Sequence, residues 1–173
     1  CSLYVTGQTR EKAFLFNEKL GNGINYGNMF EAPTETEWGN PWQANYPKIV
    51  ADLGFDHVRI PIRWEPAARS ANTAPYTISP DFLARIKMVV DANLQQGLKV
   101  IINMHHHEAL FDNPEGQKAR FLAQWQQISA YFKGYPEDLV FEILNEPHGN
   151  LTAAKWNQFL VAPLPEIRTD NPD

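Results

Sequence analysis

With 173 residues, 43% of them hydrophobic and 20% charged, the chain is long enough for one globular core and too short for two ordinary domains. Its net charge of -5 disfavours nucleic acid as a partner, because phosphate binding needs a basic stripe and none is visible. Its apolar runs stay well below the roughly 18–20 residues that cross a bilayer, so we expect no membrane span.

Short apolar runs alternate with helical patterns four times along the chain. We expect strands at residues 23–26, 57–62, 99–104 and 139–144, and the last three runs are nearly continuous in Val, Ile, Leu and Phe. Such runs are typical of parallel strands that are buried on both faces. The alternation predicts an α/β fold with a parallel sheet, and the lack of a Gly-rich loop after these runs disfavours a nucleotide-binding sheet.

The helices between the runs carry start and stop signals. We expect the first three helices at residues 40–54, 79–97 and 113–134. Each should begin with a polar capping residue followed by proline and end at a glycine. For the first of these helices we expect an inner face made of Tyr46, Ile49, Val50 and Leu53. The fourth helix should begin near Thr152 and be broken or kinked by Pro163 and Pro165.

The strand spacing is typical of the strand–helix units of a (β/α)8 TIM barrel, and a complete barrel needs eight units and about 250 residues. This chain supplies four units, so we predict a half barrel with two open sheet edges and a bare apolar inner face. Unpaired edges favour pairing with another chain. We therefore expect association, either with a second polypeptide that carries the remaining strands or as a homo-oligomer.

The strongest chemical signal is Asn145-Glu146-Pro147, which follows the fourth predicted strand. Catalytic side chains of such barrels gather at the carboxyl ends of the strands. A glycosidase needs a carboxylic acid that is protonated near neutral pH, and apolar surroundings under aromatic cover would favour that form of Glu146. Asn145 could then hydrogen-bond the 2-hydroxyl of a sugar. The alternative is that the triplet only starts a helix or turn.

The second signal is Arg59, which lies inside an otherwise apolar strand. A buried guanidinium is costly unless it is paired, so we expect it to reach a carboxylate at the barrel mouth. The alternative is an edge-strand arginine that faces solvent.

The third signal is the run His105-His106-His107-Glu108 after the third predicted strand. Three interpretations stay open: histidines that bind or support a substrate, a metal site that uses His105 and His107 from one face of an extended chain, and a core histidine. The metal interpretation lacks a further ligand cluster elsewhere in the sequence.

Aromatic residues and the first loop give weaker signals. Five Trp in so short a chain raise the expectation of a sugar site, because flat aromatic faces stack on sugar rings. Trp38 or Trp64 could provide such a platform, and Asn25 and Glu31 could bind sugar hydroxyls. The alternatives are core filling for the Trp residues and turn chemistry for the loop.

Several motifs, in order and spacing, resemble glycoside hydrolase family 5 from about Phe14 onwards, and most of all the thermophilic-type bacterial endoglucanases with mixed cellulase, β-glucanase and mannanase activity. The motifs that carry the resemblance are Gly23-Ile24-Asn25-Tyr26-Gly27-Asn28, Glu31-Ala32-Pro33, His57-Val58-Arg59-Ile60-Pro61-Ile62-Arg63-Trp64, Ile102-Asn103-Met104-His105-His106 and residues 141–152.

The resemblance implies that residues 1–173 are the N-terminal half of a retaining (β/α)8 catalytic domain. It implies that Glu146 is the acid/base catalyst, that Asn145 contacts the sugar 2-hydroxyl and that Arg59 orients the nucleophile. It gives His105 and His106 network and substrate-binding roles, and it implies neither a metal nor an organic cofactor. The family's nucleophile, a second Glu at the end of strand seven, has no counterpart in this sequence.

We therefore expect an endo-acting retaining β-glucan hydrolase of the endo-β-1,4-glucanase type, with a β-glucan polysaccharide as its substrate. The alternatives are a catalytically silent half barrel that oligomerises and at most binds carbohydrate, and, with less support, a β-mannanase, a lichenase or a metal hydrolase. The resemblance implies a bacterial protein that is secreted or held at the cell surface. Cys1, the only cysteine, could be a lipoprotein anchor or a simple processing boundary.

Overall fold

Four parallel strands form one sheet in the order β1-β2-β3-β4. The computed structural model describes residues 7–171, so the possible anchor at Cys1 lies outside the described residues. The elements in chain order are α1 (Gly7–Leu20), β1 (Gly23–Asn25), α2 (Tyr46–Asp52), β2 (His57–Ile60), α3 (Pro80–Leu94), β3 (Lys99–Asn103), α4 (Glu108–Asp112), α5 (Pro114–Tyr131), β4 (Leu139–Glu142), α6 (Ala153–Val161) and α7 (Leu164–Asp170).

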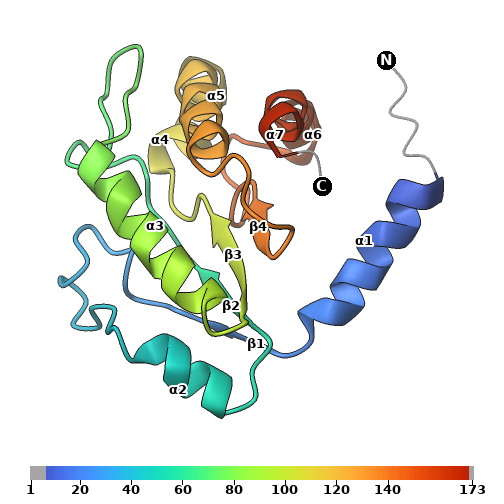
Figure 1. Ribbon diagram of the computed structural model, residues 1–173. Coiled ribbons are helices and arrows are strands. Elements are labelled where there is room, and N and C mark those ends of the chain that lie inside the picture. The colour runs from blue at the N-terminus through green and yellow to red at the C-terminus, as the bar shows by residue number, and fades with distance from the viewer. Residues whose placement is uncertain (1–6, 172–173) are drawn as a thin grey trace.

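Helices cover one side of this sheet, with α2, α3 and α5 arranged around it in chain order (Figure 1). The strand order follows the chain without a reversal, unlike a doubly wound nucleotide-binding sheet. Each strand is followed by at least one helix. The four predicted strand–helix units are therefore confirmed, and they form half of a barrel wall.

The two faces of the sheet differ in burial. On the helix side, Val58, Ile60, Val100 and Ile102 are fully buried against apolar residues of α3 and α5. On the other face, Arg59, Ile101 and Val140 lie side by side in register and are only half-buried. The second face is thus open, as we expected for half a barrel, and it is polar where Arg59 lies.

Three of the predicted helix starts are confirmed. The side chains of Ser79, Asn113 and Thr152 accept hydrogen bonds from the backbone N–H groups of Phe82, Gly116 and Lys155, and they cap α3, α5 and α6. The predicted break near Pro163 is also found, because α6 ends at Val161 and α7 begins at Leu164.

The first predicted helix was wrong in its start, and its inner face was predicted only in part, since Val50 is buried and Tyr46 packs against the core. It begins at Tyr46, and Asn40 instead donates from Nδ2 to the carbonyl of Gly27 at 2.8 Å. Because α2 has only seven residues, it turns a narrow stripe of Pro47 and Val50 inward. Ile49 and Leu53 are left 45% and 70% exposed.

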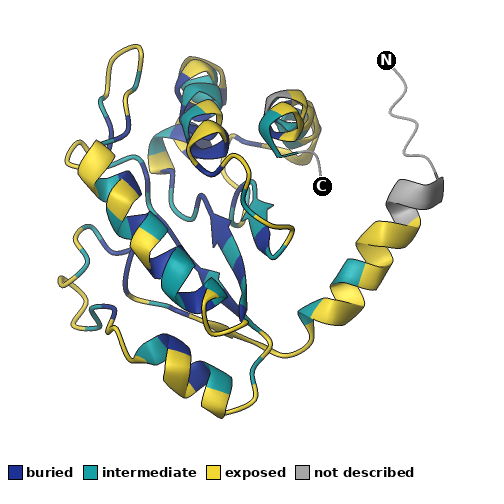
Figure 2. Cartoon of the chain, viewed as in Figure 1, coloured by how far each residue is buried: buried dark blue, intermediate teal, exposed yellow. Residues whose placement is uncertain are grey.

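Two helices were not expected from the sequence. Helix α1 projects beyond the sheet (Figure 1), and most of its described surface is exposed (Figure 2), including Phe14 and Leu15. Helix α4 is a short turn directly after the histidine run. Within residues 7–171, no helix has the length and apolar character to cross a membrane.

Candidate active site

Asn25 and Arg59 lie within β1 and β2, whereas His105 and Asn145 follow β3 and β4, where backbone hydrogen bonds between neighbouring segments continue. The backbone N–H of Asn145 donates to the carbonyl of Met104 at 2.9 Å, and that of His105 donates to Ile62 at 2.8 Å. These bonds fix the backbone at the mouth of the half barrel. The side chains that follow therefore project from a rigid rim.

Arg59 is the centre of the polar contacts at this rim. Its Nε and Nη2 donate to Oε2 and Oε1 of Glu142, both at 2.6 Å. Its Nη2 also donates to Oδ1 of Asn145 at 2.9 Å, and Nη1 donates to Oδ1 of Asn25 at 3.1 Å. The structure thus brings Asn25, Arg59 and Asn145 together, and the predicted carboxylate partner of Arg59 is found.

That partner is Glu142, a residue to which the sequence analysis gave no role. Its side chain is 33% exposed and that of Arg59 is 25% exposed, so the two form a bidentate ion pair that is partly buried. Burial by itself raises the pKa of Glu142, but hydrogen bonds from Arg59 and Asn103 outweigh it and hold the pKa below its ordinary value. Glu142 is therefore a carboxylate near neutral pH.

Asn103 is a second unassigned residue and is fully buried. Its Oδ1 accepts from the backbone N–H of Ile62 at 3.1 Å, which settles which end of the amide carries the NH₂ group. That Nδ2 lies 3.2 Å from Glu142 Oε1 and 3.2 Å from His105 Nδ1. Asn103 therefore joins the ion pair to the first histidine.

His105 is a neutral hydrogen-bond donor in this setting. Burial, together with the nearby His106 and Arg59, lowers the pKa of His105 to about 4. Since Asn103 Nδ2 can only donate, His105 Nδ1 must accept, and the ring proton is on Nε2. His105 thus has an N–H group free for another partner.

Glu146 follows Asn145 directly and is exposed. Its backbone has a φ of 43°, a left-handed conformation that is uncommon outside glycine. Nδ1 of His148 donates to its carbonyl oxygen at 2.7 Å. The aromatic cover that we expected over Glu146 is wrong for this structure, because β4 is the last strand of the sheet and its far side is open.

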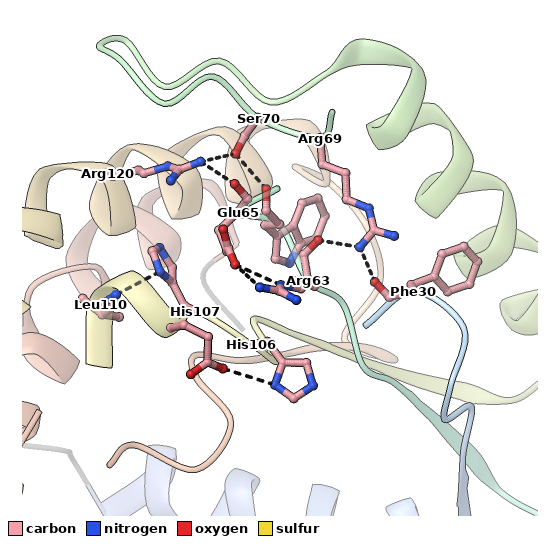
Figure 3. Close-up of polar contacts among 11 residues, drawn as sticks. Phe30, Arg63, Glu65, Arg69, Ser70, His106, His107, Leu110 and Arg120 are labelled. Carbon is pink, nitrogen blue, oxygen red and sulfur yellow. Dashed lines mark hydrogen bonds and ion pairs between the residues drawn. The ribbon is translucent and has the colours of Figure 1, made fainter. Parts of the chain in front are cut away.

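His106 lies on the outer side of His105, with ring centroids 4.7 Å apart. The ring of Trp38 meets His106 edge-on at 6.3 Å, and Trp38 is 44% exposed. Nδ1 of His106 is 3.9 Å from Oε1 of Glu108, a contact drawn in Figure 3. His105, His106 and Trp38 therefore form one continuous border of the rim, which fits the predicted substrate side.

Trp64 and Glu31 are both buried. Trp64 is fully buried, its Nε1 donates to the carbonyl of Asn103 at 2.9 Å, and so it offers no ring face to a sugar. The sugar-platform interpretation of Trp64 is wrong, and its core-filling alternative holds. Glu31 is 5% exposed and accepts from the backbone N–H groups of Asn28 and Met29, so its predicted contact with a sugar stays a prediction.

The loop after β2 is held by polar contacts, several of which are drawn in Figure 3. Ser70 Oγ donates to the carbonyl of Trp64 at 2.7 Å and accepts from Arg120 Nη2 and Gln124 Nε2 at 3.0 and 2.9 Å. Arg69 Nη1 donates to the carbonyls of Phe30 and Arg63 at 2.6 and 2.8 Å. These contacts tie the loop to α5 and to the loop after β1.

His107 belongs to this interior rather than to the rim. It is fully buried, and its Nδ1 accepts from the backbone N–H of Leu110 at 3.3 Å at the start of α4. The core interpretation therefore holds for the place of His107, but its Nε2 is buried without a hydrogen-bond partner among the described residues, so the side chain is not fully satisfied. His105 and His107 do not converge, and residues 7–171 contain no group of three or more His, Cys, Asp or Glu residues that could hold a metal ion.

Comparison with known proteins agrees with this geometry. The sequence pattern of the family described as Cellulase (glycosyl hydrolase family 5) matches residues 20–173. The chain belongs to glycosyl hydrolase family 5. Among curated relatives, Endoglucanase H of Acetivibrio thermocellus is 40% identical over 154 residues, covering 89% of this family 5 chain and 17% of that protein. Endoglucanase B of Ruminococcus albus is 35% identical over 150 residues, covering 80% and 36%.

Solved structures match the family 5 chain over most of its length. Cel5A of Thermotoga maritima in complex with mannotriose is 48% identical, with a TM-score of 0.88 over 91% of this chain and 50% of that one. A mutant form of the same enzyme in complex with cellobiose gives a TM-score of 0.87 and 53% of its chain. The chain thus spans about half the length of these structures, and its four strands are half of a TIM barrel.

Proposed function

We propose that this chain carries the acid/base half of the active site of a retaining endo-β-1,4-glucanase. In this proposal Glu146 protonates the departing glycosidic oxygen, and Asn145 hydrogen-bonds the 2-hydroxyl of the sugar. Arg59 orients the nucleophile, which comes from polypeptide outside this chain. His105, His106 and Trp38 line the substrate side of the cleft, and Asn25 and Glu31 contact sugar hydroxyls nearby.

One observation carries the proposal: Glu146 stands exposed at the end of β4, directly after an Asn145 whose Oδ1 is held by Arg59 at 2.9 Å. Nδ2 is the donor end of the Asn145 amide, and the contact of Oδ1 with Arg59 fixes the direction in which Nδ2 points. Residues in sparsely populated backbone conformations cluster at active sites, and the φ of 43° at Glu146 agrees with such a role.

The chemistry follows from general acid catalysis. The proton of Glu146 moves to the glycosidic oxygen as the bond to the anomeric carbon breaks, and a second carboxylate forms a bond to that carbon from the opposite face. Water later attacks this glycosyl ester while Glu146 takes a proton from it. Retention needs the two carboxyl groups about 5–5.5 Å apart.

The choice of substrate class is supported by the relatives. Those matched most strongly include proteins named endoglucanases, and solved complexes of Cel5A contain cellobiose or mannotriose. We therefore propose a β-1,4-glucan as the main substrate, with mannan and lichenan as alternatives. A polymer of this size does not cross a membrane, so we also propose that the protein acts outside the cell or at its surface.

We further propose that the open side of the sheet is covered by a polypeptide with the missing strands, or by a second copy of the chain. Ile101 and Val140 form a half-exposed apolar patch on this side, and β1 and β4 end the sheet with unpaired edges. Size-exclusion chromatography with light scattering tests this. A chain that stays monomeric over the whole concentration range would contradict the proposal.

A reducing-sugar assay on carboxymethylcellulose, lichenan and mannan tests the enzyme proposal when the chain is combined with a polypeptide that carries the missing strands and the nucleophile. The expected result is release of reducing ends that is lost in Glu146→Gln and retained in Glu115→Gln, a matched change at an exposed residue of α5. Equal activity in both variants would refute the role of Glu146. Sugar binding without turnover in the unchanged chain would favour the alternative of a silent carbohydrate-binding half barrel.

A further inference from the structure

Glu142 lies at the centre of the rim, yet the proposed mechanism gives it no step. It accepts two hydrogen bonds from Arg59 and one from Asn103, and these two residues in turn donate to Asn145 and His105. Glu142 is thus connected directly to Arg59 and Asn103, and through them to Asn145 and His105. A side chain in this position can fix the geometry of the whole group.

We propose that Glu142 is a positioning residue whose carboxylate holds Arg59 and Asn103 so that the amide of Asn145 and the imidazole of His105 each present an N–H group to the substrate. This inference rests on the proposed function for its effect on hydrolysis. Its structural content, the orientation of two side chains, does not depend on that function.

The first arm runs through Arg59. The guanidinium is planar, so two bonds to Glu142 fix its plane as well as its position. Nη2 uses its second direction to donate to Asn145 Oδ1 at 2.9 Å. Because the acceptor end of the amide is occupied, its NH₂ end points away from Arg59 and is available to a sugar hydroxyl.

The second arm runs through Asn103. Its NH₂ group is shared between Glu142 Oε1 and His105 Nδ1, both at 3.2 Å. A ring nitrogen that accepts cannot carry the proton, so the proton of the neutral ring is on Nε2. The burial that lowers the pKa of His105 to about 4 keeps the ring in this neutral form.

Only an acceptor suits position 142. Arg59 and Asn103 can only donate hydrogen bonds to the side chain at position 142, and a carboxylate accepts with both of its oxygens. A glutamine would turn its own NH₂ group toward one of these donors. Either Arg59 or Asn103 would then lose its hydrogen bond to residue 142, although the size of the side chain is unchanged.

The experiment compares Glu142→Gln with Glu35→Gln in the full chain. Glu35 and Arg85 form a second bidentate pair, with bonds of 3.0 and 2.5 Å and side chains 24% and 30% exposed, so it matches the first pair in charge and exposure. Side-chain ¹⁵N NMR reports the tautomer of His105 and the environment of the Asn145 amide. We expect both signals to change in E142Q and neither to change in E35Q.

Hydrolysis by the chain combined with a polypeptide that carries the missing strands gives the second readout. We expect kcat to fall about 10–100-fold in E142Q with KM little changed, because the orienting contacts matter most in the transition state. E142D keeps an acceptor-only group that is too short to reach both arms, so its kcat should be intermediate. Unchanged NMR signals and unchanged kcat in E142Q would overturn the proposal.

The two proposals can fail separately. If the unchanged chain, combined with a polypeptide that carries the missing strands, hydrolyses none of the three polysaccharides, the proposed function fails, while the NMR comparison still decides the positioning role. If E142Q does not fold, E142D decides: NMR signals and kcat at the level of the unchanged chain would overturn the inference.

Discussion

The indole N–H of Trp64 donates to the backbone carbonyl of Asn103 at 2.9 Å, and this bond joins the loop after β2 to the end of β3. Trp64 is fully buried and packs edge-on against Phe82, with centroids 5.4 Å apart. Because the side chain of Asn103 links Glu142 with His105, the residue that fixes its backbone also supports the rim.

The first prediction concerns this bond. Trp64→Phe keeps a ring in the core but removes the donor and leaves a small cavity, so the free energy of unfolding should fall by about 1–3 kcal/mol. Urea denaturation measures it. Trp38→Phe, at a ring that is 44% exposed, should change stability by less than about 0.5 kcal/mol and serves as the control. The reverse order of the two variants would contradict the buried role of Trp64.

The second prediction concerns Ser70. Its hydroxyl donates to the carbonyl of Trp64 and accepts from Arg120 and Gln124, and the residue is 2% exposed. Ser70→Ala leaves these groups without their shared partner, which should cost about 1–3 kcal/mol in unfolding free energy. Ser79→Ala removes only a helix cap and should cost about 1 kcal/mol. A loss well below about 1 kcal/mol in Ser70→Ala would argue against a special role of the Ser70 hydroxyl.

Much of the fold could be predicted from the sequence because its signals are local. Apolar runs gave the four strands, and capping residues such as Ser79 and Asn113 gave the starts of α3 and α5. The start of α2 was missed because Asn40 makes its hydrogen bond with Gly27, which is distant in sequence. A capping pattern cannot reveal that competing partner.

The candidate site was predictable only in part, for the same reason. Arg59 in an apolar strand required a carboxylate partner, but the partner is 83 residues away on β4 and depends on the register of three strands. The sequence does contain a signal for this partner, because Glu142 is the only charged residue in the otherwise apolar run Leu139–Glu142. Trp64 was misjudged because composition does not tell a buried ring from an exposed one.

The third prediction concerns pH. Burial lowers the pKa of His107 to about 4 from an ordinary value of 6.5, so the unfolded chain binds a proton at a pH where the folded chain does not. The stability due to neutral His107 is complete above pH 6.5 and is lost as the pH falls toward 4. The loss at pH 5 should be roughly 2 kcal/mol relative to pH 7.

Urea denaturation at pH 7 and pH 5 checks this prediction, with His107→Asn as the matched variant. Asparagine can still accept from the N–H of Leu110 at the start of α4, but it does not titrate. The variant should therefore lose less stability between pH 7 and pH 5 than the unchanged chain. An identical loss in both chains would show that His107 does not cause the acid sensitivity.

The fourth prediction concerns the open face of the sheet. Val140 is half-buried next to Ile101 on the side that lacks helices, whereas Leu53 is 70% exposed at the end of α2 on the outer side. If the open face is the surface that binds the missing strands or a second copy, Val140→Asp places a charge in the contact and should weaken association at least tenfold. Leu53→Asp makes the same chemical change outside that contact and should leave association unchanged. Sedimentation over a concentration series measures both, and circular dichroism checks that each variant stays folded. Equal weakening in the two variants would mean that general acidity, and not the open face, governs self-association.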